Sequence, residues 1–217
     1  MRVNDLITNM RYTLADPDQQ RWTDARLVQL INEAQNDIAK RTKFFKSDYT
    51  YTFTGNTVTI DPYIISVFRI ATLNGEHIPW VTQDELDRMY PDWRVAESED
   101  IIQYIVSDRT LTGQIMVYPK ITVGATISIT ATVVPYPVDL VSSDIQVPVI
   151  FDSAIMFYVT GRALRDDMDV QNRAIGNEQL QLYLNEIKQL QADINSNFKR
   201  QVSPTIKYYN PFNNWDK

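Results

Sequence analysis

The hydrophobic period of this 217-residue chain changes twice, and that change limits the possible folds more than any other feature. Apolar residues recur at helical spacing in residues 1–46 and again in 146–200, whereas they alternate every second residue in 47–145. Neither helical end has enough helices to bury its own apolar stripe. We therefore expect an α+β protein in which both ends form one four-helix unit and the middle is an inserted β domain.

The N-terminal end indicates two helices. Asn4 or Asp5 is suited to cap a first helix that ends near Ala15, where an Asp-Pro-Asp turn follows. Thr23 is suited to cap a second helix that runs to about Thr42. Each helix carries an apolar stripe that needs a partner, which the C-terminal end can supply.

The middle of the chain indicates short strands separated by turns. Alternation on both sides of a Gly-Asn turn predicts a hairpin from Tyr49 to Ile60. Thr82 and Glu85 fit a capping box ahead of one short helix. Four more strands are expected, at Ser66 to Leu73, Ile101 to Ser107, Gln114 to Tyr118 and Ala125 to Val134. This series predicts an antiparallel β-sandwich or barrel-like domain.

The C-terminal end indicates two further helices. Pro148 suits the first helical position because its missing N–H would have no partner there, and the following residues to Leu164 are apolar on almost every face. The last helix is expected from about Val170 to Phe198. It carries a heptad seam made of Leu180, Tyr183, Ile187, Leu190 and Ile194.

Residues 201–217 form an aromatic tail that belongs to neither pattern. The tail has too few aliphatic residues to fold alone, yet its large apolar side chains are costly to leave in water. Pro204 and Pro211 favour an extended conformation and lower the entropy lost on docking. A disordered terminus is the alternative. We expect an extended C-terminal tail that binds another protein through Ile206, Tyr208, Tyr209, Phe212 and Trp215.

The composition leaves little material for catalysis. The absence of cysteine removes disulfides, thiolate ligands and cysteine nucleophiles, and the one histidine, His77, follows an Asn-Gly turn where a solvated position is expected. No Gly-x-Ser-x-Gly or phosphate-binding glycine loop occurs. No apolar run is long enough to cross a bilayer or resembles a secretory signal. We expect no enzyme, no cofactor, no metal site and no membrane contact.

Charge is concentrated in the middle of the chain. Residues 47–145 carry 13 acidic and five basic side chains, a net charge of −8, against −6 for the whole chain. This argues against sequence-specific binding of nucleic acid, which needs clustered lysine and arginine. One small basic group ends the second helix, where the helix dipole favours it; contact with DNA or an acidic neighbour is the alternative. It consists of Lys40, Arg41, Lys43 and Lys46.

An acidic cluster in the same region offers the one catalytic alternative. Paired carboxylates can serve metal-assisted or glycosidic chemistry. A capped helical turn and a solvated loop explain the same residues without chemistry. The cluster consists of Asp84, Glu85, Asp87, Asp92, Glu97, Glu99 and Asp100.

Two segments resemble the head–tail adaptor proteins of tailed phages and the related tail tubular protein A of short-tailed phages. Residues 21–40 begin with Arg-Trp-Thr-Asp and continue as an amphipathic helix rich in Asn, Glu and Gln. Residues 151–172 resemble the third helix of those proteins, with its small and aromatic residues and the acidic turn before a long last helix. The resemblance covers the two helical ends and the order of elements, and does not cover the middle.

The resemblance implies a virion structural protein of the phage neck and tail, synthesised in the cytoplasm of a bacterial host. Such adaptors form a dodecameric ring beneath the portal, extend the DNA channel and dock the next tail component. The implied partners are the portal protein, neighbouring adaptor copies and a downstream tail or nozzle protein, with DNA only as passing cargo. Two alternatives stay open: a β-sandwich receptor- or carbohydrate-binding protein of the virion with exposed Trp80 and Trp93, and a hydrolase that uses the acidic cluster.

Overall fold

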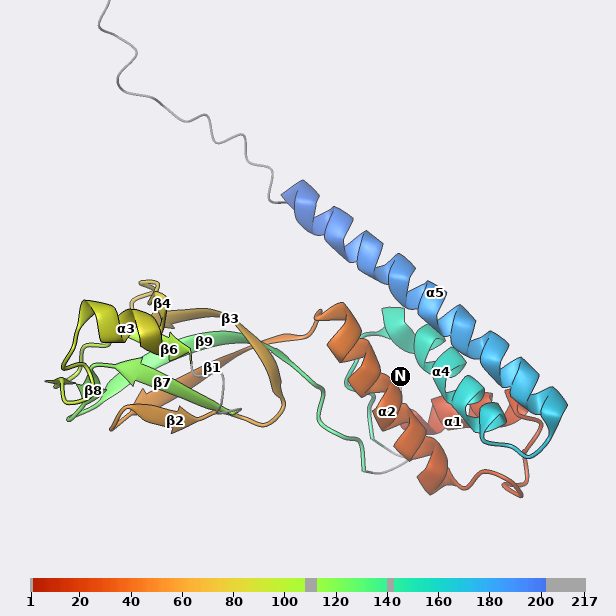
Figure 1. The fold of residues 1–217 in the computed structure, drawn as a ribbon. Coiled ribbons are helices and arrows are strands. Elements are labelled where there is room, and N and C mark those ends of the chain that lie inside the picture. The colour runs from red at the N-terminus through yellow and green to blue at the C-terminus, as the bar shows by residue number, and fades with distance from the viewer. Residues whose placement is uncertain (1, 108–112, 140–142, 202–217) are drawn as a thin grey trace, which may run out of the picture.

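The computed structural model describes residues 2–107, 113–139 and 143–201, and within them helices and strands are segregated (Figure 1). The helices are α1 (Val3–Thr13), α2 (Asp24–Thr42), α3 (Gln83–Met89), α4 (Asp152–Arg165) and α5 (Val170–Gln201), with a 3₁₀ turn, η1 (Val149–Phe151), before α4. The strands are β1 (Lys46–Phe53), β2 (Thr57–Thr59), β3 (Ile64–Thr72), β4 (Trp80–Thr82), β5 (Glu97–Ser98), β6 (Tyr104–Ser107), β7 (Gln114–Tyr118), β8 (Lys120–Ile121) and β9 (Ala125–Val133). None of these helices is long and apolar enough to span a membrane.

Helices from both ends of the chain share one apolar core. α1, α2, α4 and α5 contribute Leu6, Leu30, Ile155 and Tyr183 to it, each almost fully buried. Burying an aliphatic side chain of this size stabilises the fold by about 1.5–3 kcal/mol. The burial of these side chains therefore couples the stability of the two ends.

The backbones of α4 and α5 touch at a pair of glycines. A Cβ placed on Gly176 would lie 2.7 Å from the backbone nitrogen of Arg165 and 2.8 Å from the carbonyl oxygen of Gly161. Real Cβ atoms do not approach backbone so closely, so only glycine permits this crossing. The close approach brings the heptad seam of α5 onto the core, where Tyr183 and Ile187 are buried.

Two of the predicted caps are confirmed. The Thr23 hydroxyl oxygen accepts a hydrogen bond from the backbone N–H of Arg26 at the start of α2. At α3, Thr82 and Glu85 form the predicted capping box, in which each side chain accepts from the backbone N–H of the other residue. Both interactions span three residues, which is why the sequence alone could predict them.

The start of α1 differs from the prediction of a cap at Asn4 or Asp5. The helix begins at Val3, and Arg2, in the cap position, makes no side-chain cap hydrogen bond. The Val3 N–H donates instead to the carbonyl oxygen of Ser143, 2.9 Å away. A distant segment has thus replaced the local cap, because Val3 is fully buried in the core.

α4 also starts later than expected. Pro148 precedes η1 instead of opening the helix, and regular α-helix begins at Asp152. The 3₁₀ turn buries Phe151, whose ring lies 5.8 Å from that of Phe44 and 5.7 Å from that of Phe45. This aromatic contact joins the beginning of α4 to the segment that leads from α2 into β1.

The described strands form three sheets, with the orders β1-β9-β3, β2-β7-β6-β4 and β5-β8. The predicted hairpin from Tyr49 to Ile60 is wrong, because β1 and β2 lie in different sheets. β1 pairs with β9 over eight residues, whereas the three-residue β2 could offer it only a short ladder. The β4–β6 and β5–β8 pairs are parallel, which differs from the expected antiparallel arrangement.

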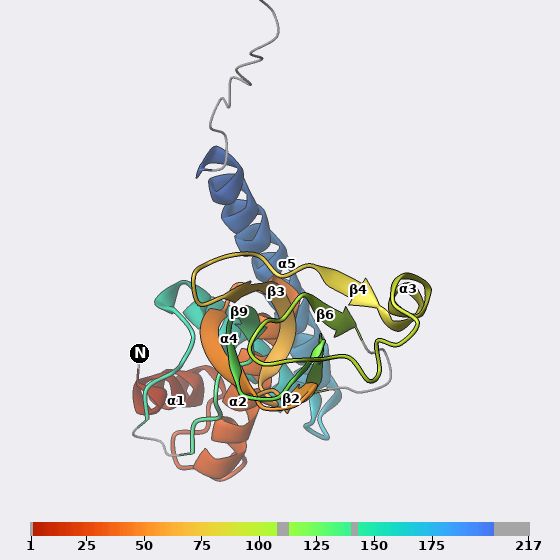
Figure 2. The same ribbon diagram turned by 90° about the vertical axis from the view of Figure 1, so that its left-hand side faces the viewer.

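The strand region has its own apolar clusters. Phe53, Ile70, Ile105 and Ile129 belong to the larger one, which joins the first two sheets. A smaller cluster lies under α3 and includes Leu86. Figure 2 views the chain from this side, with the strands in front of the helices.

The segment between β9 and η1 is held on α2 by side-chain amides. The Asn32 amide donates to the carbonyl oxygen of Val138 and accepts from its N–H, at 2.9 and 2.8 Å. Gln35, buried on the same helix, accepts from the N–H of Gln146 at 3.0 Å. These bonds fix the return of the chain from the strands to the second pair of helices.

Candidate assembly surfaces

The acidic cluster is engaged in local structure. Asp87 accepts hydrogen bonds from Trp93 Nε1 at 2.8 Å and from Arg94 Nη1 at 2.6 Å, and these two donors, Arg94 foremost, lower the pKa of Asp87. Glu97 pairs with Lys120 at 2.7 Å. In the described part of the chain, no group of three or more His, Asp or Glu side chains is placed to hold a metal ion. The contacts of Asp87 and Glu97 are those of surface acids that stabilise local structure.

The two tryptophans considered for carbohydrate binding differ in exposure. Trp93 is 8% exposed and packs under α3 with Leu86, which corrects the expectation that it is on the surface. Trp80 is 45% exposed. A sugar platform formed by both rings is therefore not available in this structure.

Two members of the basic group at the end of α2, Arg41 and Lys46, have partners within the chain. Arg41 Nε lies 2.6 Å from Asp37, and this hydrogen bond raises the pKa of Arg41. Lys46 Nζ lies 4.7 Å from the centre of the Phe68 ring. Lys43 adopts a left-handed conformation that ends the helix. His77 is exposed in its turn, as predicted.

A polar contact locks α5 onto α2 on the inner face of the helical region. The hydroxyl of Tyr183 donates to Asp37 at 2.5 Å, and burial is the main cause that raises the pKa of Tyr183 far above its ordinary value. Tyr183 also lines a cavity of about 240 Å³ together with Arg162 of α4. This hydrogen bond joins α5 to α2.

A buried carboxylate organises the loop that precedes the predicted Thr23 cap. Asp16 is 4% exposed and accepts backbone N–H bonds from Gln20 and Trp22, at 2.8 and 3.0 Å. The Arg11 guanidinium lies 3.6 Å away. Burial alone would raise the pKa of Asp16, but the backbone hydrogen bonds outweigh it and the pKa is lowered. This loop begins the segment that resembles phage adaptors.

The predicted partner-binding residues of the tail lie outside the described residues. They are Ile206, Tyr208, Tyr209, Phe212 and Trp215. The described part of α5 reaches Gln201, so the helix determines where the tail begins. Figure 1 shows that this end of α5 projects beyond the other helices.

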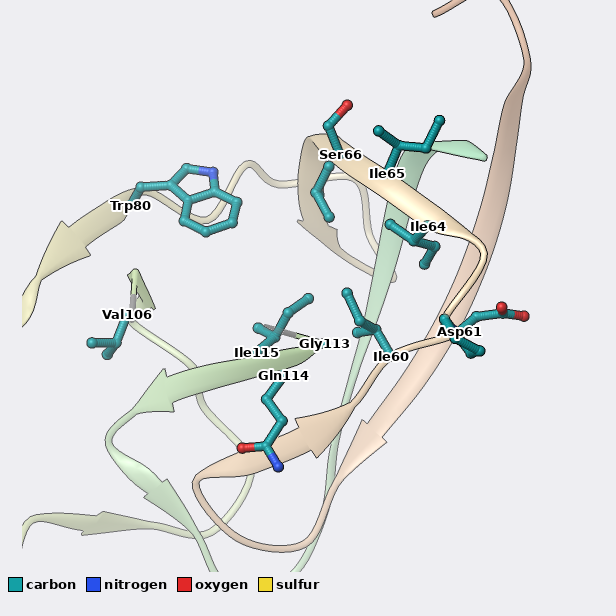
Figure 3. Close-up of a pocket in the computed structure, with 12 residues that line it drawn as sticks. Ile60, Asp61, Ile64, Ile65, Ser66, Trp80, Val106, Gly113, Gln114 and Ile115 are labelled. Atoms are coloured by element: carbon teal, nitrogen blue, oxygen red, sulfur yellow. The ribbon is translucent and has the colours of Figure 1, made fainter. Parts of the chain in front are cut away.

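Periodicity and motifs did not predict a groove in the strand region, which has a volume of about 590 Å³ (Figure 3). Its lining comes from four separate segments, and Trp80 is the one lining residue that was considered for ligand binding from the sequence. The lining residues are Ile60, Asp61, Pro62, Ile64, Ile65, Ser66, Val67, Trp80, Val106, Gly113, Gln114 and Ile115. Such a groove depends on how two sheets face each other, which local periodicity does not encode.

Comparison with a family model supports the resemblance to adaptor proteins. A family model described as SU10 adaptor protein matches residues 1–205. The match spans the helices of both ends and the strand-rich middle. No curated protein matches the chain.

Proposed function

Because the chain belongs to the SU10 adaptor protein family, we propose that it is a head–tail adaptor in the virion of a tailed phage. Its copies form a ring below the portal, extend the DNA channel and dock the next tail component. The family match over residues 1–205 is the observation that carries the proposal. The role is assembly by surface complementarity, and the protein catalyses no reaction.

The contacts within the helical region suggest a rigid unit, which is what ring formation requires. A ring closes only when every copy meets the next at the same angle, so each copy needs a rigid body. The contact of Gly161 with Gly176 and the bond from Tyr183 to Asp37 restrict how α5 can move against α4 and α2. We assign ring formation and portal docking to the helical region. We assign contact with the next component of the phage tail to the strand region.

The negative charge of the strand region supports the proposal that this region lies along the path of the DNA. Residues 47–145 carry a net charge of −8, and the acidic side chains of the described part lie mostly at its surface. A surface of this sign repels phosphates and reduces sticking while DNA passes. DNA is then cargo and makes no specific contact.

The tail supplies the binding segment of the proposal. The described part of α5 ends at Gln201, and the aromatic residues Tyr208, Tyr209, Phe212 and Trp215 follow 7 to 14 residues later in the sequence. Each aromatic side chain buried on a partner contributes about 1.5–3 kcal/mol, and a ring multiplies the effect by avidity. We assign Ile206 to the same surface.

Electron microscopy of the protein mixed with its portal protein tests the class of function. We expect a ring of adaptor copies, dodecameric in the resembled family, on the face of the portal that receives the tail. Labelled protein at the fibres or the baseplate of purified virions, with none at the neck, would contradict the proposal.

Removal of residues 203–217 tests the role of the tail. We expect the melting temperature to stay nearly unchanged while stable attachment in the assembly reaction is lost. Within the full chain, Tyr208→Ala with Trp215→Ala should weaken attachment, and the matched control, Asn210→Ala with Asn213→Ala, should not. Normal assembly of the truncated protein would exclude the tail as the binding segment.

A further inference from the structure

The end of the strand region that lies farthest from the helices carries the third sheet (Figure 1). In Figure 1, β8 and α3 lie at this end, opposite the side where β1 and β9 lead to the helical region. β5 and β8 pair in parallel over two residues, and Glu97 of β5 forms an ion pair with Lys120 of β8 at 2.7 Å. We call residues 92–101 and 120–124 the distal tip.

Three apolar side chains of the distal tip are exposed to solvent. Val95, Ile101 and Val123 are between 63% and 76% exposed. Val95 lies two residues before β5. The Ile101 N–H donates to the hydroxyl oxygen of Ser98 at 3.3 Å. The Val123 N–H donates to the carbonyl oxygen of Glu99 at 3.0 Å, so all three residues lie beside the β5–β8 pair. Single exposed apolar residues are ordinary, whereas a group of them at one place marks an interaction site.

The end of α3 adds to this surface. Met89 and Tyr90, where α3 ends, are also exposed. The Tyr90 ring stacks on that of Tyr118, with 5.2 Å between the ring centres, and Tyr118 lies two residues before β8. α3 and β8 therefore contribute apolar side chains to the same end of the molecule.

The distal tip has little internal packing to stabilise it. A two-stranded sheet is marginal in water, and parallel pairing is slightly less stable per residue than antiparallel pairing. Of the large apolar side chains of the tip, Trp93 and Ile121 are buried, whereas Val95, Ile101 and Val123 are not. A partner that covers these three side chains would supply the burial that the tip lacks.

The charges of the distal tip that have no counter-ion are negative. Its two basic side chains, Arg94 and Lys120, are each paired with an acid, at 2.6 and 2.7 Å. Asp92, Glu99 and Asp100 are exposed, and none of them forms an ion pair with a residue that the structure describes. A basic protein surface is attracted to this end, and the phosphates of DNA are repelled from it.

The symmetry of the proposed ring bears on the choice between a second copy and a different protein. In a ring with cyclic symmetry, every copy holds its tip at the same height and radius. Neighbouring tips carry the same unpaired acids and repel each other, which disfavours contact between the tips of two copies. The set of tips offers several equal sites to one multivalent partner instead.

We propose that the distal tip binds a protein whose surface has an apolar centre flanked by lysine or arginine, and that in the virion this protein is the next tail component. The exposed apolar side chains of the tip meet the apolar centre, and its unpaired acids meet the cations. This assignment rests on the adaptor role proposed above, and it adds the surface that docks the partner and the chemistry of that partner.

Site-specific cross-linking in assembled virions tests the identity of the partner. The full chain carries p-benzoylphenylalanine in place of Ile101 and replaces the parent protein during infection, and the purified virions are irradiated. We expect a cross-link from position 101 to a virion protein that is neither the portal protein nor another adaptor copy. Mass spectrometry should find lysine or arginine beside the cross-linked position. The same probe in place of Val123 should reach the same protein.

The matched control carries p-benzoylphenylalanine in place of Tyr136, which is exposed where the chain returns from β9 to the helices. This probe should not reach the protein that position 101 reaches. Cross-links from positions 101 and 123 only to adaptor copies or to the portal protein would overturn the proposal. So would the absence of any cross-link from both positions.

Binding kinetics test the two kinds of contact. Full-length variants are measured by biolayer interferometry against the purified virion protein that the cross-link identifies. Asp100→Lys should slow association at least about fivefold at low salt and less at high salt, because charges at the rim of an interface act through long-range attraction. Ile101→Ser should speed dissociation at least about tenfold, because it removes an apolar contact.

Asp139→Lys is the matched control for the charge. Asp139 is exposed beside Val138, which is hydrogen-bonded to Asn32 of the helical region. The substitution makes the same change in net charge and should alter association by less than about twofold. Equal melting temperatures would show that the variants are folded. Equal effects of Asp100→Lys and Asp139→Lys on association, or unchanged dissociation of Ile101→Ser, would overturn the proposal.

The outcome separates this inference from the proposed function. A ring at the neck of the virion in which position 101 reaches only adaptor copies would overturn the assignment of the tip and leave the adaptor role intact. Absence of the protein from the neck would contradict the adaptor role even if position 101 reached a basic virion protein.

Discussion

The helical and strand regions of this chain differ in where they keep their polar groups. Of the six buried polar or charged residues in the described part, Thr132 lies in β9 and the other five lie in the helical region. Those five are Arg11, Asp16, Gln35, Asp152 and Thr160. In the strand region, Asp87 pairs with Arg94 and Glu97 with Lys120 at the surface.

The difference suggests that the two regions use polar groups for different purposes. A buried polar group is costly unless it has the right partner, so it penalises every arrangement except the native one. Arg11, Asp16 and Gln35 have such partners, and the helical region gains a defined orientation of its elements in this way; Asp152 is the exception. The strand region leaves its charge available to solvent, to DNA or to another protein.

The largest effect is expected from breaking the closest contact of the helical region. Gly176→Ala should lower the free energy of unfolding by about 3 kcal/mol, because the new Cβ would overlap backbone atoms of Arg165 and Gly161 that cannot move aside. Denaturant titration measures it. Gly55→Ala in the strand region is the control, since no atom lies within 4 Å of its Cβ, and it should change stability by less than about 0.5 kcal/mol. Equal losses of stability in Gly176→Ala and Gly55→Ala would show that α4 and α5 pack no more closely than the strand region does around Gly55.

A smaller loss is expected from the buried carboxylate of the first loop. Asp16→Ala should cost about 2 kcal/mol near neutral pH, because the N–H groups of Gln20 and Trp22 lose their acceptor. The folded-state pKa of Asp16 is lowered, so its contribution is present above the ordinary aspartate pKa and disappears as pH falls through the lowered value.

The difference in stability between the parent and the Asp16→Ala variant should therefore shrink as the pH falls below the ordinary aspartate pKa. Chemical denaturation at a series of pH values measures this. The neighbouring Asp18 is exposed, and Asp18→Ala should show neither the loss nor the pH dependence. A difference that stayed constant down to the lowest pH would contradict the role of the Asp16 charge.

A gain in stability is expected at Asp152, where the buried carboxylate has no hydrogen-bond partner for either oxygen in the described part of the chain. Burial raises the pKa of Asp152, so stability is lost as pH rises from the ordinary aspartate pKa through the raised value. Asp152→Asn removes the ionisable group. It should be more stable than the parent near pH 8 and equal to it near pH 3, within about 1 kcal/mol throughout. Lower stability of Asp152→Asn near pH 8 would indicate a cation that binds this carboxylate.

The smallest effect is expected at the surface of the strand region. Glu97→Gln breaks the ion pair with Lys120, whose side chains are both about half exposed, and should cost less than about 0.5 kcal/mol. A double-mutant cycle with Lys120→Met isolates the pair. A coupling energy near that of a buried pair would mean that the strand region depends on charge as strongly as the helical region does.

Features that depend on neighbours within a few residues were predictable. Thr23 and Thr82 cap their helices as expected, because each cap acceptor lies three residues from its donor. The heptad seam of α5 faces the core, since helical spacing already places its residues on one side. His77 is exposed because its turn lies at the surface.

Features that depend on distant segments were not predictable. β1 pairs with β9, more than 70 residues away, and does not form the expected hairpin with β2. The longer ladder and the buried face of Ile127 and Ile129 favour this pairing. Trp93 is buried because its ring packs in the cluster under α3 and its Nε1 donates a hydrogen bond to Asp87. Ser143 replaced the predicted cap of α1.

By itself, the sequence determined the helices with their local caps, the acidic middle and an aromatic tail whose large apolar side chains are costly to leave in water, because spacing, charge and composition are properties of the chain alone. Only the tertiary structure decided that two glycines bring α4 and α5 into backbone contact, which strands pair, and that an apolar groove opens between β3 and β4. The physical reason is that these features depend on the fit between surfaces far apart in sequence, and that fit exists only once the chain has packed.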